Sequence, residues 1–267
     1  MAPLLESPSI AVERTLEILE AVAHRSGGMS NADISRKLRI PKSSASYILR
    51  TLQHRGYLRR DPETGRYRLG VKVLSLSRGA LTGLDVREAA QPVMRHLVEQ
   101  SRLTAHLAIL DGDEAVYVEK VDAPGFIKMD TWVGRRMEIH STSVGKALAA
   151  YLDPAKIGAI LKSRGMKKLT SRTITSPARF MKELERVREQ GYAVDDEENS
   201  PEVRCVAAPI FGAAGQVEAS LGMTGTIHQV SLEMLPRLAA AVKDATQRIS
   251  HQLGYDARLR RSHAAGL

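Results

Sequence analysis

The sequence contains only one cysteine, Cys205, in 267 residues. A single cysteine excludes an intramolecular disulfide framework and suits a reducing compartment. No apolar run approaches the roughly 18–20 residues that span a bilayer. Residues 1–10 lack the basic and apolar segments of a signal peptide, and the chain has no internal repeat or low-complexity tract. We therefore expect a cytoplasmic protein without membrane association, long enough for two domains.

Positive charge is concentrated in one stretch. The chain carries 39 Lys and Arg against 30 Asp and Glu, a net charge of +9. The stretch from Arg36 to Lys72 contains eleven Lys or Arg and only two acids, so it accounts for the whole net charge. An excess confined in this way is typical of a surface that binds nucleic acid, and a solvated basic face is the alternative.

Three helices are expected before this basic stretch ends. The first runs from Ser9 to Arg25 and stops at a glycine pair; its predicted apolar stripe is Ile10, Leu16, Ile18, Leu19 and Val22. Ser30 and Asp33 have the spacing of a capping box at the start of a short second helix. Pro41 suits the first position of a third helix that ends near His54.

The third helix has one apolar and one polar face. Ala45, Ile48, Leu49 and Leu52 recur at helical spacing and predict a buried stripe. Hydroxyls, cations and a tyrosine on the other face suit phosphates and base edges. A basic hairpin follows, with Gly65 in its turn. Together these elements predict a winged helix-turn-helix. Its expected DNA contacts are Lys42, Ser43, Ser44, Ser46, Tyr47 and Arg50 on the helix and Arg66 on the wing.

The rest of the chain mixes helices and strands, which predicts an α+β domain. A helical connector is expected over 71–83 and a further helix over 85–100. Strands are expected over 103–111, 115–121, 126–133, 204–211 and 217–226, and helices over 143–152, 154–162, 177–190 and 231–253.

The chain resembles the IclR family of transcription regulators over nearly its full length. Six blocks carry the resemblance: Ala11–Leu19, Ile40–Ala45, Leu52–Leu58, His140–Ala147, Gly191–Glu198 and Cys205–Phe211. The resemblance implies a GAF-like α/β effector-binding domain, a dimer or dimer of dimers, and operator half-sites read by paired recognition helices. The implied limits are 8–70 for the DNA-binding domain, 71–84 for a helical linker, 85–254 for the effector domain and 255–267 for a disordered tail.

The block from His140 to Ala147 places hydroxyl residues and a glycine at a helix start. Free backbone N–H groups and the helix dipole favour a carboxylate there, so we expect Ser143, Val144 and Gly145 to contact an effector acid. An ordinary Ser/Thr N-cap is the alternative. Aromatic, aliphatic and sugar acids all remain open as effectors.

The acidic run Asp195 to Glu198 permits three interpretations: a metal site, a solvated turn, or one ligand-facing carboxylate among structural neighbours. The resemblance implies that Asp195 faces the effector and that Cys205, which otherwise reads as a small buried hydrophobe, lines the same pocket. It also assigns pocket positions to Gly222 and Thr224. We expect Trp132, Met129 and Phe126 to wall the pocket, with core packing as the alternative role for at least one of them. We expect no metal or cofactor.

Two other functional classes each leave one part of the sequence unexplained. An enzyme would use His140, Cys205 and Asp195 as a base, nucleophile and orienting group, but this would leave the basic N-terminal domain unexplained. A constitutive DNA-binding protein without an effector would leave the large second domain unexplained. We therefore expect a non-enzymatic regulator that binds double-stranded DNA and a small carboxylate.

Overall fold

The computed structural model describes residues 9–81, 85–126 and 128–255. The chain divides into two compact units, Met1–Gly83 and Leu84–Leu267, and each is described by itself. The tail over 255–267, which the sequence analysis expects to be disordered, lies almost wholly outside the described residues, as do 82–84 of the expected linker. The domain limits drawn from the sequence stay predictions. Among the described residues, no helix is long and apolar enough to cross a membrane.

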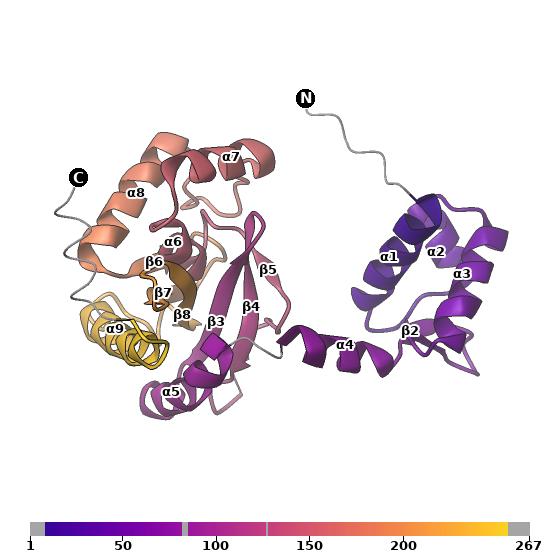
Figure 1. The fold of residues 1–267 in the computed structure, drawn as a ribbon, viewed down its shortest axis with the longest axis horizontal. Coiled ribbons are helices and arrows are strands. Elements are labelled where there is room, and N and C mark those ends of the chain that lie inside the picture. The colour runs from indigo at the N-terminus through magenta and orange to yellow at the C-terminus, as the bar shows by residue number, and fades with distance from the viewer. Residues whose placement is uncertain (1–8, 82–84, 127, 256–267) are drawn as a thin grey trace. The chain divides into compact units, whose positions relative to one another are not determined.

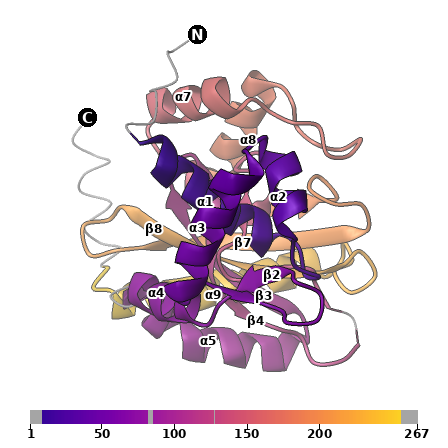
Figure 2. The ribbon, with the colours of Figure 1, turned by 90° about the vertical axis from the view of Figure 1, so that its right-hand side faces the viewer.

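The first unit packs three helices and a β-hairpin around one core (Figures 1 and 2). Its elements are α1 (Ile10–Ala23), α2 (Asn31–Leu38), α3 (Lys42–His54), β1 (Leu58–Arg60) and β2 (Tyr67–Leu69). The two strands pair antiparallel, and Met29 adds a bridge to Tyr67. Ile18, Ile34 and Leu49, one from each helix, are fully buried in this core.

Local chemistry accounts for the helix limits. Ser30 and Asp33 form the predicted capping box at the start of α2. Pro41 lies at the N-cap of α3, one residue before the position that we expected. The predicted stripe of α1 is only half correct, because Ile18 and Val22 are buried whereas Ile10 and Leu16 are exposed.

A helix α4 (Lys72–Leu81) follows the hairpin. Val71, which precedes it, and Leu74 and Leu76 within it are exposed. These apolar side chains are therefore not packed against the rest of the first unit, and exposed apolar residues that lie together are typical of an interaction surface.

The second unit is built on a six-stranded sheet that is antiparallel throughout, in the order β5-β4-β3-β8-β7-β6. Its strands are β3 (Thr104–Asp111), β4 (Glu114–Val121), β5 (Arg136–Met137), β6 (Ala193–Asp196), β7 (Val203–Phe211) and β8 (Val217–Thr226).

Helices cover both faces of this sheet (Figure 1). Helices α5 (Asp85–Ser101) and α9 (Leu235–Gln252) pack together and against the sheet. On the other face α6 (Ser143–Ala149) lies against β7 and β8, and α7 (Pro154–Arg164) and α8 (Pro177–Gln190) pack around it. The fold is thus an N-terminal helix-turn-helix unit followed by a mixed α/β unit, as the sequence predicts.

The strands predicted from the sequence differ from the structure in one segment that is not a strand and in one strand that was not predicted. The described residues of 126–133 form a loop, and the short strand β5 comes after it. Apolar residues alone favoured a strand there, although Phe126 is fully exposed. Conversely, β6 was missed, because an edge strand that ends in Asp195-Asp196 lacks the apolar alternation of a typical strand.

Candidate functional site

The polar face of α3 is open to solvent. Lys42, Ser43, Tyr47 and Arg50 are exposed, whereas Ser44 and Ser46 are half-buried. Opposite them Ala45, Leu49 and Leu52 are buried. The helix therefore presents six of the seven residues expected to contact DNA without losing its contact with the core.

The seventh residue, Arg66, is engaged within the unit. Its guanidinium Nη1 donates a hydrogen bond to the Gly28 carbonyl at 3.0 Å and lies 3.6 Å from the Asp33 carboxylate. These contacts join the wing to the turn before α2. A DNA contact by Arg66 stays a prediction, but its first role is structural.

The second unit contains a polar cavity of about 250 Å³ between the sheet, the start of α6 and the loop after β4. Of the eight residues that the sequence assigned to the effector, Ser143, Val144, Asp195, Cys205 and Thr224 line the cavity. Gly145, Gly222 and Trp132 do not line it. The cavity is also lined by residues that the sequence did not predict, among them His106, Tyr117, Thr131, Arg135, Thr142 and Asn199.

Two backbone amides at the start of α6 have no acceptor. Among the described residues, the N–H groups of Ser143 and Val144 have no hydrogen-bond partner. The Gly145 amide differs, because it donates to the Thr142 hydroxyl at 3.1 Å. Thr142 is thus the N-cap. Of the three residues whose amides we expected to bind the acid, only Ser143 and Val144 have an N–H group free to do so.

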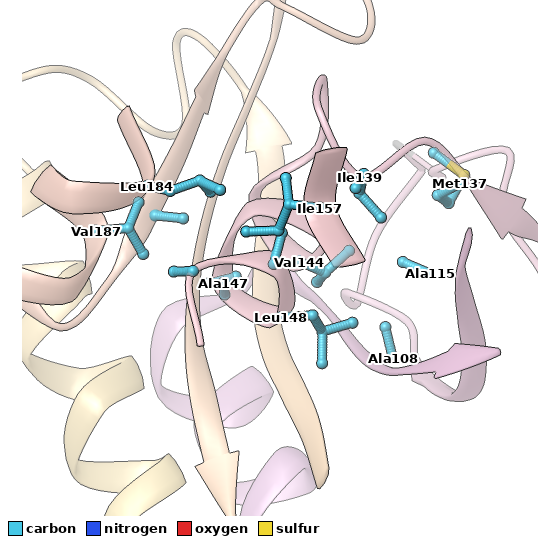
Figure 3. Packing of buried hydrophobic residues seen from close by; sticks show 14 of the residues in the cluster. Ala108, Ala115, Met137, Ile139, Val144, Ala147, Leu148, Ile157, Leu184 and Val187 are labelled. Carbon is cyan, nitrogen blue, oxygen red and sulfur yellow. The ribbon is translucent and has the colours of Figure 1, made fainter. Parts of the chain in front are cut away.

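Gly145 and Gly222 instead allow close packing. A Cβ at Gly145 would lie 2.5 Å from the Ile139 Cα and 2.8 Å from the Glu138 carbonyl oxygen. A Cβ at Gly222 would lie 2.8 Å from Val144 Cγ1. Both glycines therefore let α6 approach its neighbours, in the core where Val144, Ala147 and Leu148 meet α7 and α8 (Figure 3).

Three of the four acids in the run Asp195 to Glu198 have clearly separate roles. The Asp195 carboxylate is buried, lines the cavity, and accepts hydrogen bonds through Oδ1 from the Glu198 and Asn199 amides at 2.8 and 3.2 Å. Asp196 pairs with Arg172 and Arg204, each at 2.6 Å. Glu198 Oε1 lies 2.6 Å from Nζ of Lys146, which is completely buried.

Burial sets the protonation of the cavity wall. It raises the pKa of Asp195 to about 7, and the Lys146 charge and the two backbone hydrogen bonds only partly oppose this. Burial, and then the neighbouring Asp195, also hold the pKa of the Cys205 thiol well above its usual value. Cys205 is therefore a protonated thiol that faces the cavity and is a poor nucleophile.

His106 links three walls of the cavity. Its Nε2 lies 2.7 Å from the Thr131 hydroxyl, its Nδ1 lies 3.4 Å from the Thr224 hydroxyl, and its ring stacks on Tyr117 at 4.5 Å. Burial and then the nearby Lys120 lower the pKa of His106 to about 3. The ring is neutral at physiological pH and can donate one hydrogen bond and accept another.

The loop after β4 covers part of the cavity. Lys120 holds it by donating to the carbonyls of Met129 and Thr131 at 3.0 and 2.8 Å. Met129 lines the cavity as expected. Trp132 does not, because it is half exposed and lies against the Arg135 guanidinium at 4.9 Å.

The three residues that the sequence offered as a catalytic set, His140, Cys205 and Asp195, do not all line the cavity. His140 Nε2 contacts the Lys167 carbonyl at 3.1 Å, and His140 is not among the residues that line the cavity beside Asp195 and Cys205. Within the described residues, no group of three or more His, Cys, Asp or Glu side chains is arranged to hold a metal ion.

Comparison with known proteins identifies the family. The model of the IclR helix-turn-helix domain matches residues 11–62, and that of the bacterial transcriptional regulator IclR C-terminal domain matches residues 78–251. This chain belongs to the IclR family. It is 34% identical to the regulator XynR of Escherichia coli K12 over 96% of this chain and 100% of the relative. It is 35% identical to KdgR of the same organism over 84% of this chain and 85% of the relative.

A solved structure gives the same result. The IclR protein of Thermotoga maritima superposes with a TM-score of 0.77 at 30% identity, covering 91% of this chain and 98% of that protein. The chain is therefore a helix-turn-helix transcription regulator of the IclR type, with a DNA-binding first domain and a second domain of the kind that responds to small-molecule effectors.

Proposed function

We propose that this IclR-type regulator acts in the cytoplasm, binds a palindromic operator as a dimer or dimer of dimers, and releases or tightens its hold when a small organic acid enters the cavity. The regulated genes form a neighbouring catabolic operon. The observation that carries this proposal is the partly covered cavity of about 250 Å³, into which residues from the sheet and α6 converge. Such a cavity has no purpose in a constitutive DNA-binding protein.

The acid binds with its carboxylate on the unpaired amides of Ser143 and Val144. Its polar end faces Asp195, Cys205 and Thr224 across the cavity. The neutral His106 orients the Thr131 and Thr224 hydroxyls without adding charge to the cavity. The volume has room for about eight water molecules of about 30 Å³ each, so we expect a small acid.

Ser143→Pro tests this assignment directly. Ser143 is the first residue of α6, where proline fits, and Thr142 before it is extended at φ −113° and ψ 146°. The substitution removes the amide proton without breaking the helix, whereas the matched control Ser143→Ala removes only the hydroxyl. A thermal-shift panel of aliphatic, aromatic and sugar acids identifies a ligand, and calorimetry then compares the three proteins.

We expect Ser143→Pro to weaken binding by at least about tenfold, because it deletes a hydrogen bond to a charged group, and Ser143→Ala to bind nearly normally. Wild-type affinity in the proline variant would place the carboxylate elsewhere. A panel in which no acid shifts the melting temperature would contradict the effector class.

Dimerisation rests on a separate feature, the exposed apolar residues Val71, Leu74 and Leu76 around α4. One recognition helix gives too small an interface for a specific site, so two must act together. Light scattering should give at least a dimer at micromolar concentration, and Leu76→Glu should weaken it. A wild-type monomer, with and without DNA, would contradict the proposal.

A further inference from the structure

The exposed side of α3 divides into two stripes. Ser46, Arg50 and His54 follow one another at intervals of four residues and therefore lie along one side of the helix. These three residues line a groove, together with Arg60, Gly65 and Tyr67 of the hairpin. The start of α2 contributes the rest of its wall. Lys42, Ser43 and Tyr47 do not line this groove.

The groove brings together two arginines from different elements. Arg60 is held in place by a hydrogen bond from its Nε to the Gly65 carbonyl at 3.3 Å, and its guanidinium lies 5.9 Å from the centre of the Tyr67 ring. Arg50 is exposed on α3. Among the described residues, neither arginine forms an ion pair.

Two acids that adjoin groove residues in the chain, Asp33 and Asp61, have partners of their own. Asp33 is held by the Ser30 capping box and by Arg66, and Asp61 accepts hydrogen bonds from Glu63 and Thr64. No acidic residue is among those described as lining the groove. The groove is therefore a cationic site, about 830 Å³ in volume and open to solvent, in which Arg60 is held by its hydrogen bond to Gly65.

We propose that this groove holds one phosphodiester of the DNA backbone, gripped jointly by Arg50 of α3 and Arg60 of the wing. The proposal rests on the DNA-binding function of the family and refines it. A guanidinium matches a phosphate through two parallel hydrogen bonds, and such contacts fix the register of a protein on DNA without reading sequence. Of the two kinds of contact that the polar face of α3 suits, Arg50 thus makes the phosphate contact and is a positioning residue. Base reading falls to Ser43, Ser44 and Tyr47.

The test measures full-length protein on two duplexes of equal length. One duplex is selected from a random pool by the wild-type protein, and the other has a fixed arbitrary sequence. The variants are Arg50→Ala, Arg60→Ala and the double variant. Lys182→Ala, which removes an exposed cation from the second unit, controls for net charge. Melting temperatures verify folding.

We expect each single variant to lose about ten- to hundredfold in affinity, by the same factor on both duplexes, with a shallower dependence of affinity on salt. The double variant should lose clearly less than the product of the two single losses, because the first substitution already frees the shared phosphate. Arg50→Lys and Arg60→Lys should keep the salt dependence and recover part of the affinity, since they retain a point charge but not the fork.

Three results would overturn the proposal. A loss confined to the selected duplex would make Arg50 a base reader. Additive losses would assign the arginines to separate phosphates, and an equal loss in Lys182→Ala would reduce the effect to net charge. A wild-type protein that binds neither duplex would instead contradict DNA binding itself, so the two failures are distinguishable.

Discussion

The two units of this regulator use charge in opposite ways. In the first, cations such as Lys42 and Arg50 stand exposed on a helix whose opposite face is buried. In the second, Lys146 is completely buried and paired with Glu198, and the buried Asp195 faces a cavity. Exposed charge suits a large polyanion that arrives from solvent, whereas buried charge shapes an interior for a small molecule.

The largest expected effect breaks the buried pair. Lys146→Met leaves the Glu198 carboxylate without its partner in an environment that already raises the Glu198 pKa. We expect a loss of about 3–5 kcal/mol in the free energy of unfolding of the second unit, measured by urea denaturation. The double variant Lys146→Met, Glu198→Gln should regain most of it. An unchanged midpoint in Lys146→Met would mean that the pair is not buried in solution.

Asp195 makes the second unit sensitive to pH. Its pKa in the folded protein is about 7, against an ordinary 3.8. Because the folded state holds the proton more tightly, this contribution to stability is complete below about pH 4 and is lost as the pH rises to about 7. The loss is on the order of 4 kcal/mol, at about 1.4 kcal/mol for each pKa unit.

Asp195→Asn should abolish this dependence and be the more stable protein at pH 8, because its side-chain oxygen still accepts the two backbone hydrogen bonds. Urea denaturation between pH 4 and pH 8 provides the comparison. A variant with the same pH profile as the wild type would show that another group titrates.

Gly145→Ala tests the packing of α6. The added Cβ meets the backbone of Glu138 and Ile139, which cannot move as a side chain would. Overpacking of this kind costs about 1–3 kcal/mol. As a matched control, Gly158→Ala on α7 has open space around its Cβ and should be neutral or stabilising. Equal melting temperatures for both variants would contradict the close approach at Gly145.

The smallest expected effect concerns Arg66. Its substitution by alanine removes the hydrogen bond to Gly28, which we expect to cost about 0.5–1.5 kcal/mol of stability in the first unit. DNA affinity should fall less than in Arg60→Ala, measured by gel shift at fixed salt. A larger loss of DNA affinity in Arg66→Ala than in Arg60→Ala would show that Arg66 contacts DNA directly and would contradict the role of Arg60 in the groove.

The sequence predicted the first unit well because its signals are local. A capping box, an amphipathic helix and a basic hairpin each lie within a few residues of one another, and the cations that matter are exposed. Local sequence patterns did not predict which residues of α1 are buried, nor that Arg66 contacts Gly28 and Asp33, because both depend on residues that are distant in the sequence.

The cavity was harder to predict because strand pairing assembles it. Cys205 is opposite Asp195 on β6 and opposite Thr224 on β8, and His106 reaches Thr131 on a loop 25 residues away. The family resemblance supplied Asp195, Cys205 and Thr224, but nothing near His106 in sequence marks it as part of a binding site. Gly145 and Gly222 do not line the cavity, since a glycine in a motif signals close approach without saying to what. Their contact with an effector stays a prediction.

The central claim is that occupancy of the cavity changes DNA affinity. Fluorescence anisotropy of a labelled operator duplex, titrated with wild-type protein and with Ser143→Pro, tests it with and without the acid found by thermal shift. We predict that the acid changes the wild-type affinity by about 5–150-fold. In Ser143→Pro the same response should need at least about tenfold more acid, while the affinity without acid equals that of the wild type. An unchanged wild-type affinity at saturating acid, or a full response in Ser143→Pro at the acid concentration that suffices for the wild type, would contradict the account.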